Sequence, residues 1–324
     1  MRLWKRASDA LKDQSSLWQA SLSRRHPDIE KAVIRATSHH PTSSPSSRRN
    51  IDRVRHWLRL SPSNLTPILR SLSSRISKTR SWPVALKGLL LTHALLNSPS
   101  PSSIGRLPFD LSSFRAPDDD ASPFDPFVRA YYAFLDHKSA TTFLLHRPDA
   151  CDMTQELLML QSLQGLVDLL VAIRPAPAAA FAPLVLDVME GVVVELYEVY
   201  GKICRGIATV LLDIYSAGRA DAAMALRVVR NATRQGDELA DFLDVCREMR
   251  IANAAEFPVI DRIPEEGIRE LEEIVEGLTK EKVEMKTVIT QEWERFEEDS
   301  VAASCGQQQH ESRIGEAPDL ITLF

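Results

Sequence analysis

Apolar residues recur along most of the chain at the three- and four-residue spacing of an amphipathic helix. This spacing predicts helices near 2–12, 28–36, 51–58, 65–72, 82–96, 127–145, 154–173, 183–216, 220–249 and 264–296. No period-two alternation is long enough for a strand, and the flanks of the β-prone run Val192–Val194 keep helical spacing. The pattern therefore predicts an all-α fold, a superhelical stack of about 9–11 helices with long C-terminal helices.

Changes in composition divide the chain into segments. Residues 97–126 are dense in Ser, Pro and Asp and predict a long loop with one short helical turn, and the chain turns polar from Ser300. We predict one helical domain over 1–296, made of a front half at 1–96, the loop, and a second helical half at 127–296. Residues 297–324 are predicted to form a disordered tail.

Charge and composition narrow the classes of function. The chain has 324 residues, and its 12 glycines are too few for a fold rich in tight turns. The net charge of −5 conceals an asymmetry, because residues 1–90 carry a net +13 and the remainder carries −18. A basic front half suggests an anionic partner, either a membrane surface or a nucleic acid. The sequence contains no clean run of the ~20 apolar residues that a membrane span needs, so none is predicted.

Signatures of catalysis and metal binding are missing from the sequence. It contains no Walker loop, no Gly-x-Ser-x-Gly and no His-Glu-x-x-His. The four cysteines form no Cys-x-x-Cys pair, and we expect that no Cys or carboxylate joins His39 and His40. There is no apolar region of a secretory signal at the N-terminus. We expect a cytoplasmic protein that is not an enzyme and has no cofactor or metal.

Two pairs of cations form a candidate anion site. Lys31 and Arg35 are four residues apart and share one helical face. Arg48 and Arg49 lie where a loop leads into the next helix. Cations from one helix and from the start of another can converge on a polyphosphate, to which a helix N-terminus adds free N–H groups. The alternative from spacing alone is a solvated basic face.

The order of residues around these cations resembles a known family. Lys31-Ala-Val-Ile-Arg35-Ala-Thr-Ser-His39, then Pro45, the basic pair and a helix, is similar to the phosphoinositide site of plant-type ANTH-domain clathrin assembly proteins. Ser81–Lys87 with Thr92-His93 resembles the Trp-x-Val-x-x-Lys…Thr-His helix of that family. Phe127–Leu135 resembles its Phe-x-Arg-x-Tyr-x-x-Tyr-Leu segment. The resemblance covers roughly residues 1–295.

The resemblance implies a superhelical domain that docks on phosphatidylinositol 4,5-bisphosphate in the cytosolic leaflet and recruits clathrin, without enzymatic activity. It implies a peripheral location on coated pits and vesicles of the plasma membrane and the Golgi apparatus. Lys31 and Arg35 match the family's basic helix positions, and Arg49 matches the later lysine of its loop. Arg48, which supplements Arg49, and Asn50 complete the predicted binding site. Ser47 stands where the family often has lysine, and Asn50 stands where it has histidine. These departures predict a weaker headgroup site, or one tilted toward another phosphoinositide.

The two ends of the chain carry further candidate contacts. Leu3, Trp4 and Leu11 share a face of a basic N-terminal helix and are predicted to insert into the membrane interface, the alternative being that this helix packs on the domain. Leu320, Ile321, Leu323 and Phe324 resemble a clathrin box, the alternative being a tail that folds back on the helices.

Three further interpretations concern other partners. Asp125-Pro126-Phe127 reads as an adaptor-binding tripeptide, but it opens a predicted helix, so we expect Phe127 in the core. A helical scaffold that binds a vesicle SNARE is an alternative to clathrin recruitment. A nucleic-acid-binding protein is a third class, disfavoured because Trp57 and Trp82 of the basic region sit on apolar faces.

Overall fold

The computed structural model describes residues 2–23, 26–42, 45–98, 104–117, 122–145, 152–258, 260 and 263–277. The chain divides into two compact units, Met1–Glu276 and Gly277–Phe324. The elements of the first unit are α1 (Arg2–Ser21), α2 (Pro27–Ala36), α3 (Pro45–Leu60), η1 (Pro62–Asn64), α4 (Leu65–Ile76), α5 (Trp82–Leu96), α6 (Asp125–Leu145), α7 (Met153–Val171), α8 (Pro183–Leu212), η3 (Ile214–Ser216), α9 (Arg219–Glu248) and α10 (Ala252–Ala255).

The all-α prediction is confirmed. Ten labelled α-helices are joined by a further helical stretch over 265–277, and no strand occurs in the described part of the chain. The predicted limits of the helical domain and tail, at 296 and 297, lie outside the described residues and stay predictions.

Most predicted helix limits agree with the structure to within a few residues, and three differ. The N-terminal helix α1 continues to Ser21, although the apolar spacing predicted it only to about residue 12. Helix α3 begins at Pro45, six residues before the start that the apolar spacing predicted, so Arg48 and Arg49 lie in its first turn rather than in a loop. The helix predicted over 183–216 ends at Leu212, and a separate 3-10 turn, η3, follows it.

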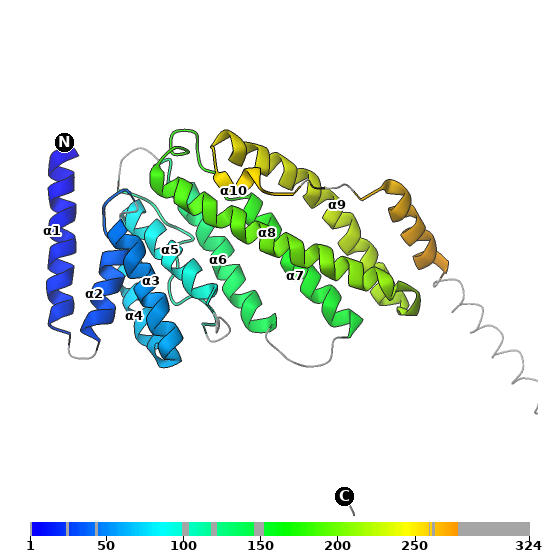
Figure 1. Ribbon diagram of the computed structural model, residues 1–324, viewed down its shortest axis with the longest axis horizontal. Coiled ribbons are helices and arrows are strands. Elements are labelled where there is room, and N and C mark those ends of the chain that lie inside the picture. Colours follow the sequence, from blue (N-terminus) through cyan, green and yellow to red (C-terminus); the bar gives the residue numbers. More distant parts are fainter. Residues whose placement is uncertain are drawn as a thin grey trace, which may run out of the picture. The chain divides into compact units, whose positions relative to one another are not determined.

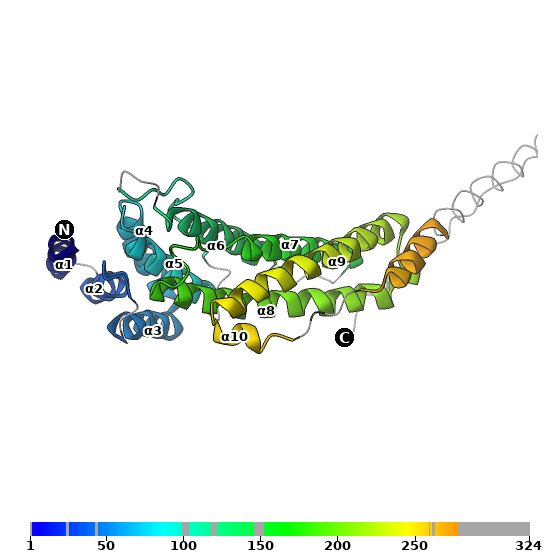
Figure 2. The same ribbon diagram turned by 90° about the horizontal axis from the view of Figure 1, so that it is seen from above.

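Successive helices of the first unit pack side by side (Figures 1 and 2). At one edge α1 packs on α2, and α2 packs on α3 and α4. Further along the chain α5 contacts α6, α6 contacts α7, and α7 lies against both α8 and α9. The predicted stack of helices is therefore present in the first unit.

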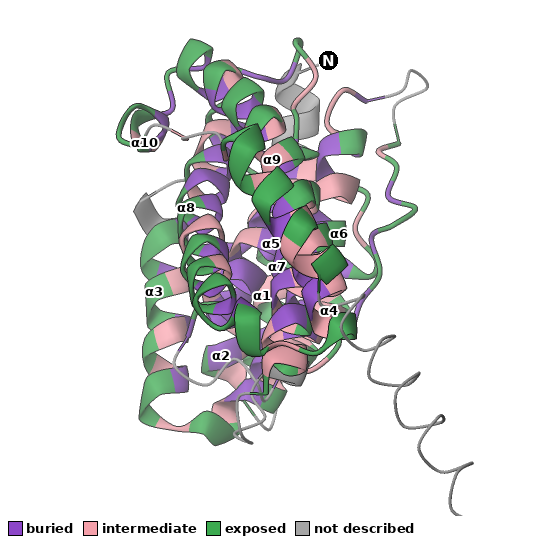
Figure 3. Ribbon diagram, turned by 90° about the vertical axis from the view of Figure 1, so that its right-hand side faces the viewer, coloured by how far each residue is buried: buried purple, intermediate pink, exposed green. Residues whose placement is uncertain are grey.

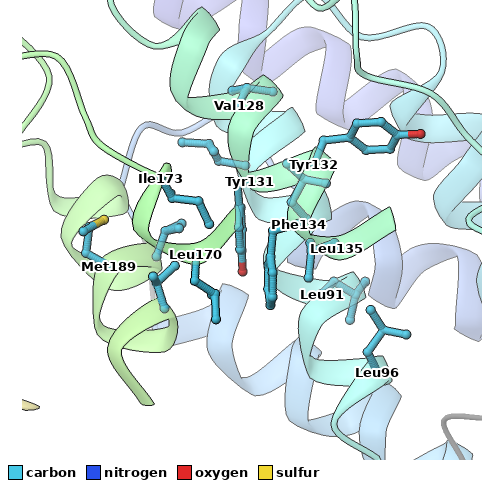
Figure 4. Close-up of a cluster of buried hydrophobic side chains, with 14 of the residues drawn as sticks. Leu91, Leu96, Val128, Tyr131, Tyr132, Phe134, Leu135, Leu170, Ile173 and Met189 are labelled. Atoms are coloured by element: carbon cyan, nitrogen blue, oxygen red, sulfur yellow. The ribbon is translucent and has the colours of Figure 1, made fainter. Parts of the chain in front are cut away.

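The core lies along α5 and α6. Twelve of the fifteen residues of α5 are buried, which is typical of a helix enclosed on all sides. Tyr131 and Phe134 of α6 lie between leucines of α5 and the residues Leu170 and Met189 (Figure 4). The outer faces of α3 and α9 are largely exposed (Figure 3). Phe127 is 1% exposed, so the prediction that it belongs to the core is confirmed.

The described part of the predicted long loop, 104–117, contains no helix but is packed against the core. Leu107, Phe109 and Phe114 are buried in it. The Tyr132 hydroxyl donates to the Phe109 carbonyl at 3.1 Å, and the Ser73 hydroxyl donates to the Pro108 carbonyl at 2.6 Å. Tyr132 thus pairs the carbonyl of the buried Phe109, and Ser73 ties the neighbouring, exposed Pro108 to α4.

A buried polar cluster joins α5, α6 and α8. The Glu195 carboxylate accepts from His93 Nε2 at 3.1 Å and from Asn97 Nδ2 at 3.2 Å, and it forms an ion pair with Lys138. The Tyr131 hydroxyl lies 2.9 Å from His93 Nδ1. Burial by itself raises the pKa of Glu195, but the hydrogen bond from His93 and the charge of Lys138 outweigh it and lower the pKa to about 2.

Replacing Glu195 with glutamine is expected to lower the free energy of unfolding by about 3 kcal/mol, because Lys138 would keep a buried charge without its counter-ion. In the wild type the contribution of Glu195 is fully present above its ordinary pKa of 4.5 and is lost as the pH falls toward 2. Urea titrations at pH 7 and pH 3 should therefore differ less for Glu195→Gln than for the wild type. Glu248→Gln, at an exposed position of α9, is the control. Equal stability of both variants at pH 7 would contradict the assignment.

Candidate functional site

Helix α2 supplies the first two predicted cations. Its apolar side, with Ile29, Ala32 and Val33, is buried against the neighbouring helices. That packing leaves Arg35 exposed in the last turn and Lys31 half-buried one turn earlier. A cation in the last turn is also favoured by the partial negative charge of a helix C-terminus.

Helix α3 supplies the other two predicted cations, Arg48 and Arg49, from its first turn. The buried Ser47 hydroxyl donates to the Ala36 carbonyl at 2.6 Å and so joins the start of α3 to the end of α2. Arg48 and Arg49 follow directly and are both exposed, whereas Asn50 is only 6% exposed. The structure therefore brings Arg35 and the basic pair to one end of the unit (Figure 1), and it buries Asn50 beneath that surface.

The connection between α2 and α3 is held from inside by Lys87. This residue of α5 is 1% exposed, and its ammonium donates to the Ser38 carbonyl at 3.2 Å, the Ser38 hydroxyl at 3.0 Å and the His40 carbonyl at 2.7 Å. Burial lowers the pKa of Lys87 to about 8, although the negative charges of Asp13 and Asp187 act to raise it. In the sequence Lys87 belongs to the Ser81–Lys87 motif, which does not indicate what the residue does. In the structure its ammonium group positions the loop between α2 and α3.

A second anchor comes from α1 and α4. The Asp13 carboxylate accepts from the backbone N–H of His39 at 2.9 Å, lies 2.7 Å from His39 Nδ1, and pairs with Arg75 at 2.5 Å. Arg75 also donates to the Thr37 carbonyl at 3.1 Å. The expectation that no carboxylate joins the histidines is therefore wrong, because Asp13 contacts His39. The two residues are 26 positions apart, so the contact forms only when α1 packs beside the loop. Within the described residues, no three His, Cys, Asp or Glu side chains form a metal-binding group.

An acidic residue from α8 faces the basic surface. Arg48 Nη2 donates to Asp187 Oδ1 at 3.0 Å, a contact between residues 139 positions apart. The Arg48 side chain remains 67% exposed, so the pair lies at the surface. Arg53, one turn after Arg49 on α3, is also exposed. Sequence reasoning missed both additions: the four-residue spacing from Arg49 signals Arg53, but no local pattern signals Asp187.

The predicted membrane-inserting segment is helical, as expected, and belongs to a longer helix. The side chains of Leu3 and Trp4 lie outside the described residues. Leu11 is 69% exposed, and Trp18, seven residues later on the same face, is 72% exposed. Leu22, in the turn just after α1 ends, is 66% exposed. Ala20 on the opposite face is buried. The helix thus packs on the unit by one side and exposes apolar side chains on the other, where Trp18 continues the spacing of Leu11.

The remaining predicted contacts cannot be placed on this surface. The clathrin-box-like residues Leu320, Ile321, Leu323 and Phe324 lie outside the described residues.

A cleft of about 840 Å³ between α1, α2 and α4 is lined by Arg70, Arg75 and Lys78, among others, but by none of the four predicted cations. The basic site is therefore an open surface at two helix ends, separate from this cleft.

Fold and site together define an all-helical protein with a basic surface built from adjoining helix ends. Of the helices in the described part of the chain, none is long and apolar enough to cross a bilayer. A sequence model of the ANTH domain matches residues 28–150 and 144–277. Three proteins of Arabidopsis thaliana, each named "Putative clathrin assembly protein", are 40%, 37% and 40% identical to the chain. The alignments cover 92%, 92% and 85% of the chain and 88%, 89% and 82% of these relatives. The chain belongs to the ANTH-domain family.

Proposed function

We propose that this chain is a peripheral membrane adaptor that binds a phosphoinositide headgroup through Lys31, Arg35, Arg48 and Arg49 and recruits clathrin. The observation that carries the proposal is the junction of α2 and α3, where Ser47 bonds to Ala36 and the exposed arginines of both helices come to one end of the unit. We infer that phosphatidylinositol 4,5-bisphosphate is the preferred lipid.

The chemistry of the junction suits a ligand with several phosphates. Guanidinium groups make charge-assisted hydrogen bonds to phosphate oxygens, and the first turn of α3 adds backbone N–H groups and the positive end of its dipole. Lys87 and Asp13 hold the connecting loop from two sides. Because the loop is held before the ligand arrives, little ordering is needed on binding.

Helix α1 supports a membrane-facing orientation. Its N-terminal end lies at the same end of the unit as the last turn of α2 (Figure 1). Leu3 and Trp4 in the first turns would enter the headgroup boundary together with Leu11, while Arg2, Lys5, Arg6 and Lys12 face phosphates. Binding would then combine recognition of a headgroup with shallow insertion.

Recruitment of clathrin rests on two supports. The relatives in Arabidopsis thaliana carry clathrin assembly in their names, and the segment Leu320–Phe324 has the acidic-flanked apolar pattern of a clathrin box. The protein would act on clathrin-coated pits and vesicles, at the plasma membrane and the Golgi apparatus. Recognition of a vesicle SNARE remains a further role to be tested on the same protein.

Co-sedimentation of the full chain with vesicles tests the lipid half of this proposal. Vesicles of phosphatidylcholine are compared with vesicles that also contain single phosphoinositides or, at equal charge, phosphatidylserine. We expect the strongest pelleting with phosphatidylinositol 4,5-bisphosphate and weaker pelleting with phosphatidylserine, because only a clustered headgroup engages four cations at once. Equal binding to all anionic vesicles would contradict a headgroup site. A shifted nucleic acid band without any pelleting would favour the nucleic-acid alternative.

A further inference from the structure

The connection between α7 and α8 exposes an aromatic side chain that the basic site does not explain. Phe181 is 69% exposed, and Pro177 and Ala178 in the same connection are exposed as well. From residue 175 to residue 186 the sequence contains no charged or polar side chain. Single exposed apolar residues are common on protein surfaces, but here Pro177, Ala178, Phe181 and Pro183 are exposed within seven residues, and such a cluster of exposed apolar side chains is a feature of interaction surfaces.

The backbone below Phe181 is ordered. The N–H of Ala179 donates to the Ala176 carbonyl at 2.8 Å, and the N–H of Ala182 donates to the Ala179 carbonyl at 3.0 Å. Ala179 and Ala180 are buried, so two consecutive residues anchor the connection to the unit. This turn therefore holds Phe181 outward, and α8 begins two residues later, at Pro183.

This connection lies beside the basic site. Asp187, in the second turn of α8, pairs with Arg48 at 3.0 Å, so the start of α8 adjoins the start of α3. In Figure 1 the connection before α8 lies at the end of the unit where α2 ends and α3 begins. The N-terminal end of α1 is found at that end too. An uncharged apolar loop and a cationic surface thus occupy one end of the unit.

We propose that the α7–α8 connection is a second membrane contact, in which Phe181 enters the boundary between headgroups and acyl chains while the cations hold the headgroup. The inference rests on the proposed function, because it takes its partner from the adjoining basic site. A bilayer suits this surface better than a protein groove, since a charge-free loop beside exposed arginines matches the apolar interior and anionic surface of a membrane. The phenyl ring would lose its contact with water on insertion, and vesicle binding would tighten accordingly.

Vesicle binding of Phe181→Ser and Tyr215→Ser in the full chain tests the inference. Tyr215 is a matched control, because it is 76% exposed in η3, beyond the other end of the 30-residue helix α8, about 45 Å away. On vesicles of phosphatidylcholine and phosphatidylinositol 4,5-bisphosphate we expect Phe181→Ser to bind about five- to tenfold more weakly. Tyr215→Ser should bind like the wild type, and Phe181→Trp should bind at least as tightly.

Calorimetry with soluble inositol 1,4,5-trisphosphate separates insertion from headgroup recognition. Both serine variants should bind this headgroup like the wild type, because it offers no acyl boundary. Vesicle binding of Phe181→Ser equal to that of the wild type would overturn the inference, and would mean that the loop contacts something other than a bilayer. An equal loss for trisphosphate and vesicles would also overturn it, because the loop would then act by positioning Arg48. If the wild type itself fails to pellet, the proposed function has failed and this inference fails with it.

Discussion

Replacing Arg35 and Arg49 with glutamate is expected to abolish binding to phosphoinositide vesicles while leaving the helical circular dichroism unchanged. Each basic residue near an anionic membrane contributes about 1 kcal/mol, and a reversal also adds repulsion, so two reversals exceed a tenfold loss. Both residues are exposed at the α2–α3 junction, so the fold does not depend on burying them. Vesicle co-sedimentation measures the loss, and circular dichroism checks the fold.

Two further variants make this test specific to the site. Arg219→Glu with Arg227→Glu reverses two exposed cations of α9, which changes the net charge equally at a place away from the α2–α3 junction. These reversals should cost far less binding. Asp187→Asn removes the carboxylate that competes for Arg48 and should strengthen binding about fivefold, the opposite sign. Unchanged binding of the Arg35 and Arg49 double variant would remove the site from α2 and α3, and equal losses in both double variants would indicate only bulk charge.

Deleting residues 319–324, or replacing Leu320 and Leu323 with alanine, is expected to remove clathrin from pull-downs. A short linear segment binds a groove modestly, because ordering a flexible chain opposes the gain from burial. Each large apolar side chain contributes about 1.5–3 kcal/mol at best, so losing two leaves little affinity. Ile314→Ala, an apolar residue of the same region outside the box, is the control.

Membrane binding should be untouched by these changes to the tail. The headgroup residues lie ~270 positions earlier in the sequence, on α2 and α3. The same truncated protein should therefore still pellet with vesicles of phosphatidylcholine and phosphatidylinositol 4,5-bisphosphate. If the truncated chain still captures clathrin, the binding segment lies elsewhere or another adaptor connects the protein to the coat.

The sequence was a sufficient guide to most of the helices and to the cations of the site. Helices α2, α5 and α9 lie within one or two residues of the limits predicted from apolar spacing. The four-residue spacing from Lys31 indicates Arg35, and the order of residues that resembles the family indicates Arg49. These features depend on neighbours within one or two helical turns, and a linear sequence displays such neighbours directly.

Other features depend on residues that meet only after folding. Lys87 reaches Ser38 across 49 positions, and Arg48 meets Asp187 across 139. The exposure of Phe181 is equally nonlocal, because an apolar residue after a helix reads as core until the packing leaves it outside. The helices and their cationic faces follow from the order of residues, because local hydrogen bonding and periodic burial act along the chain. The loop that Lys87 holds, the carboxylate that pairs with Arg48 and the outward position of Phe181 instead depend on which helices become neighbours, so they emerge only when the helices pack.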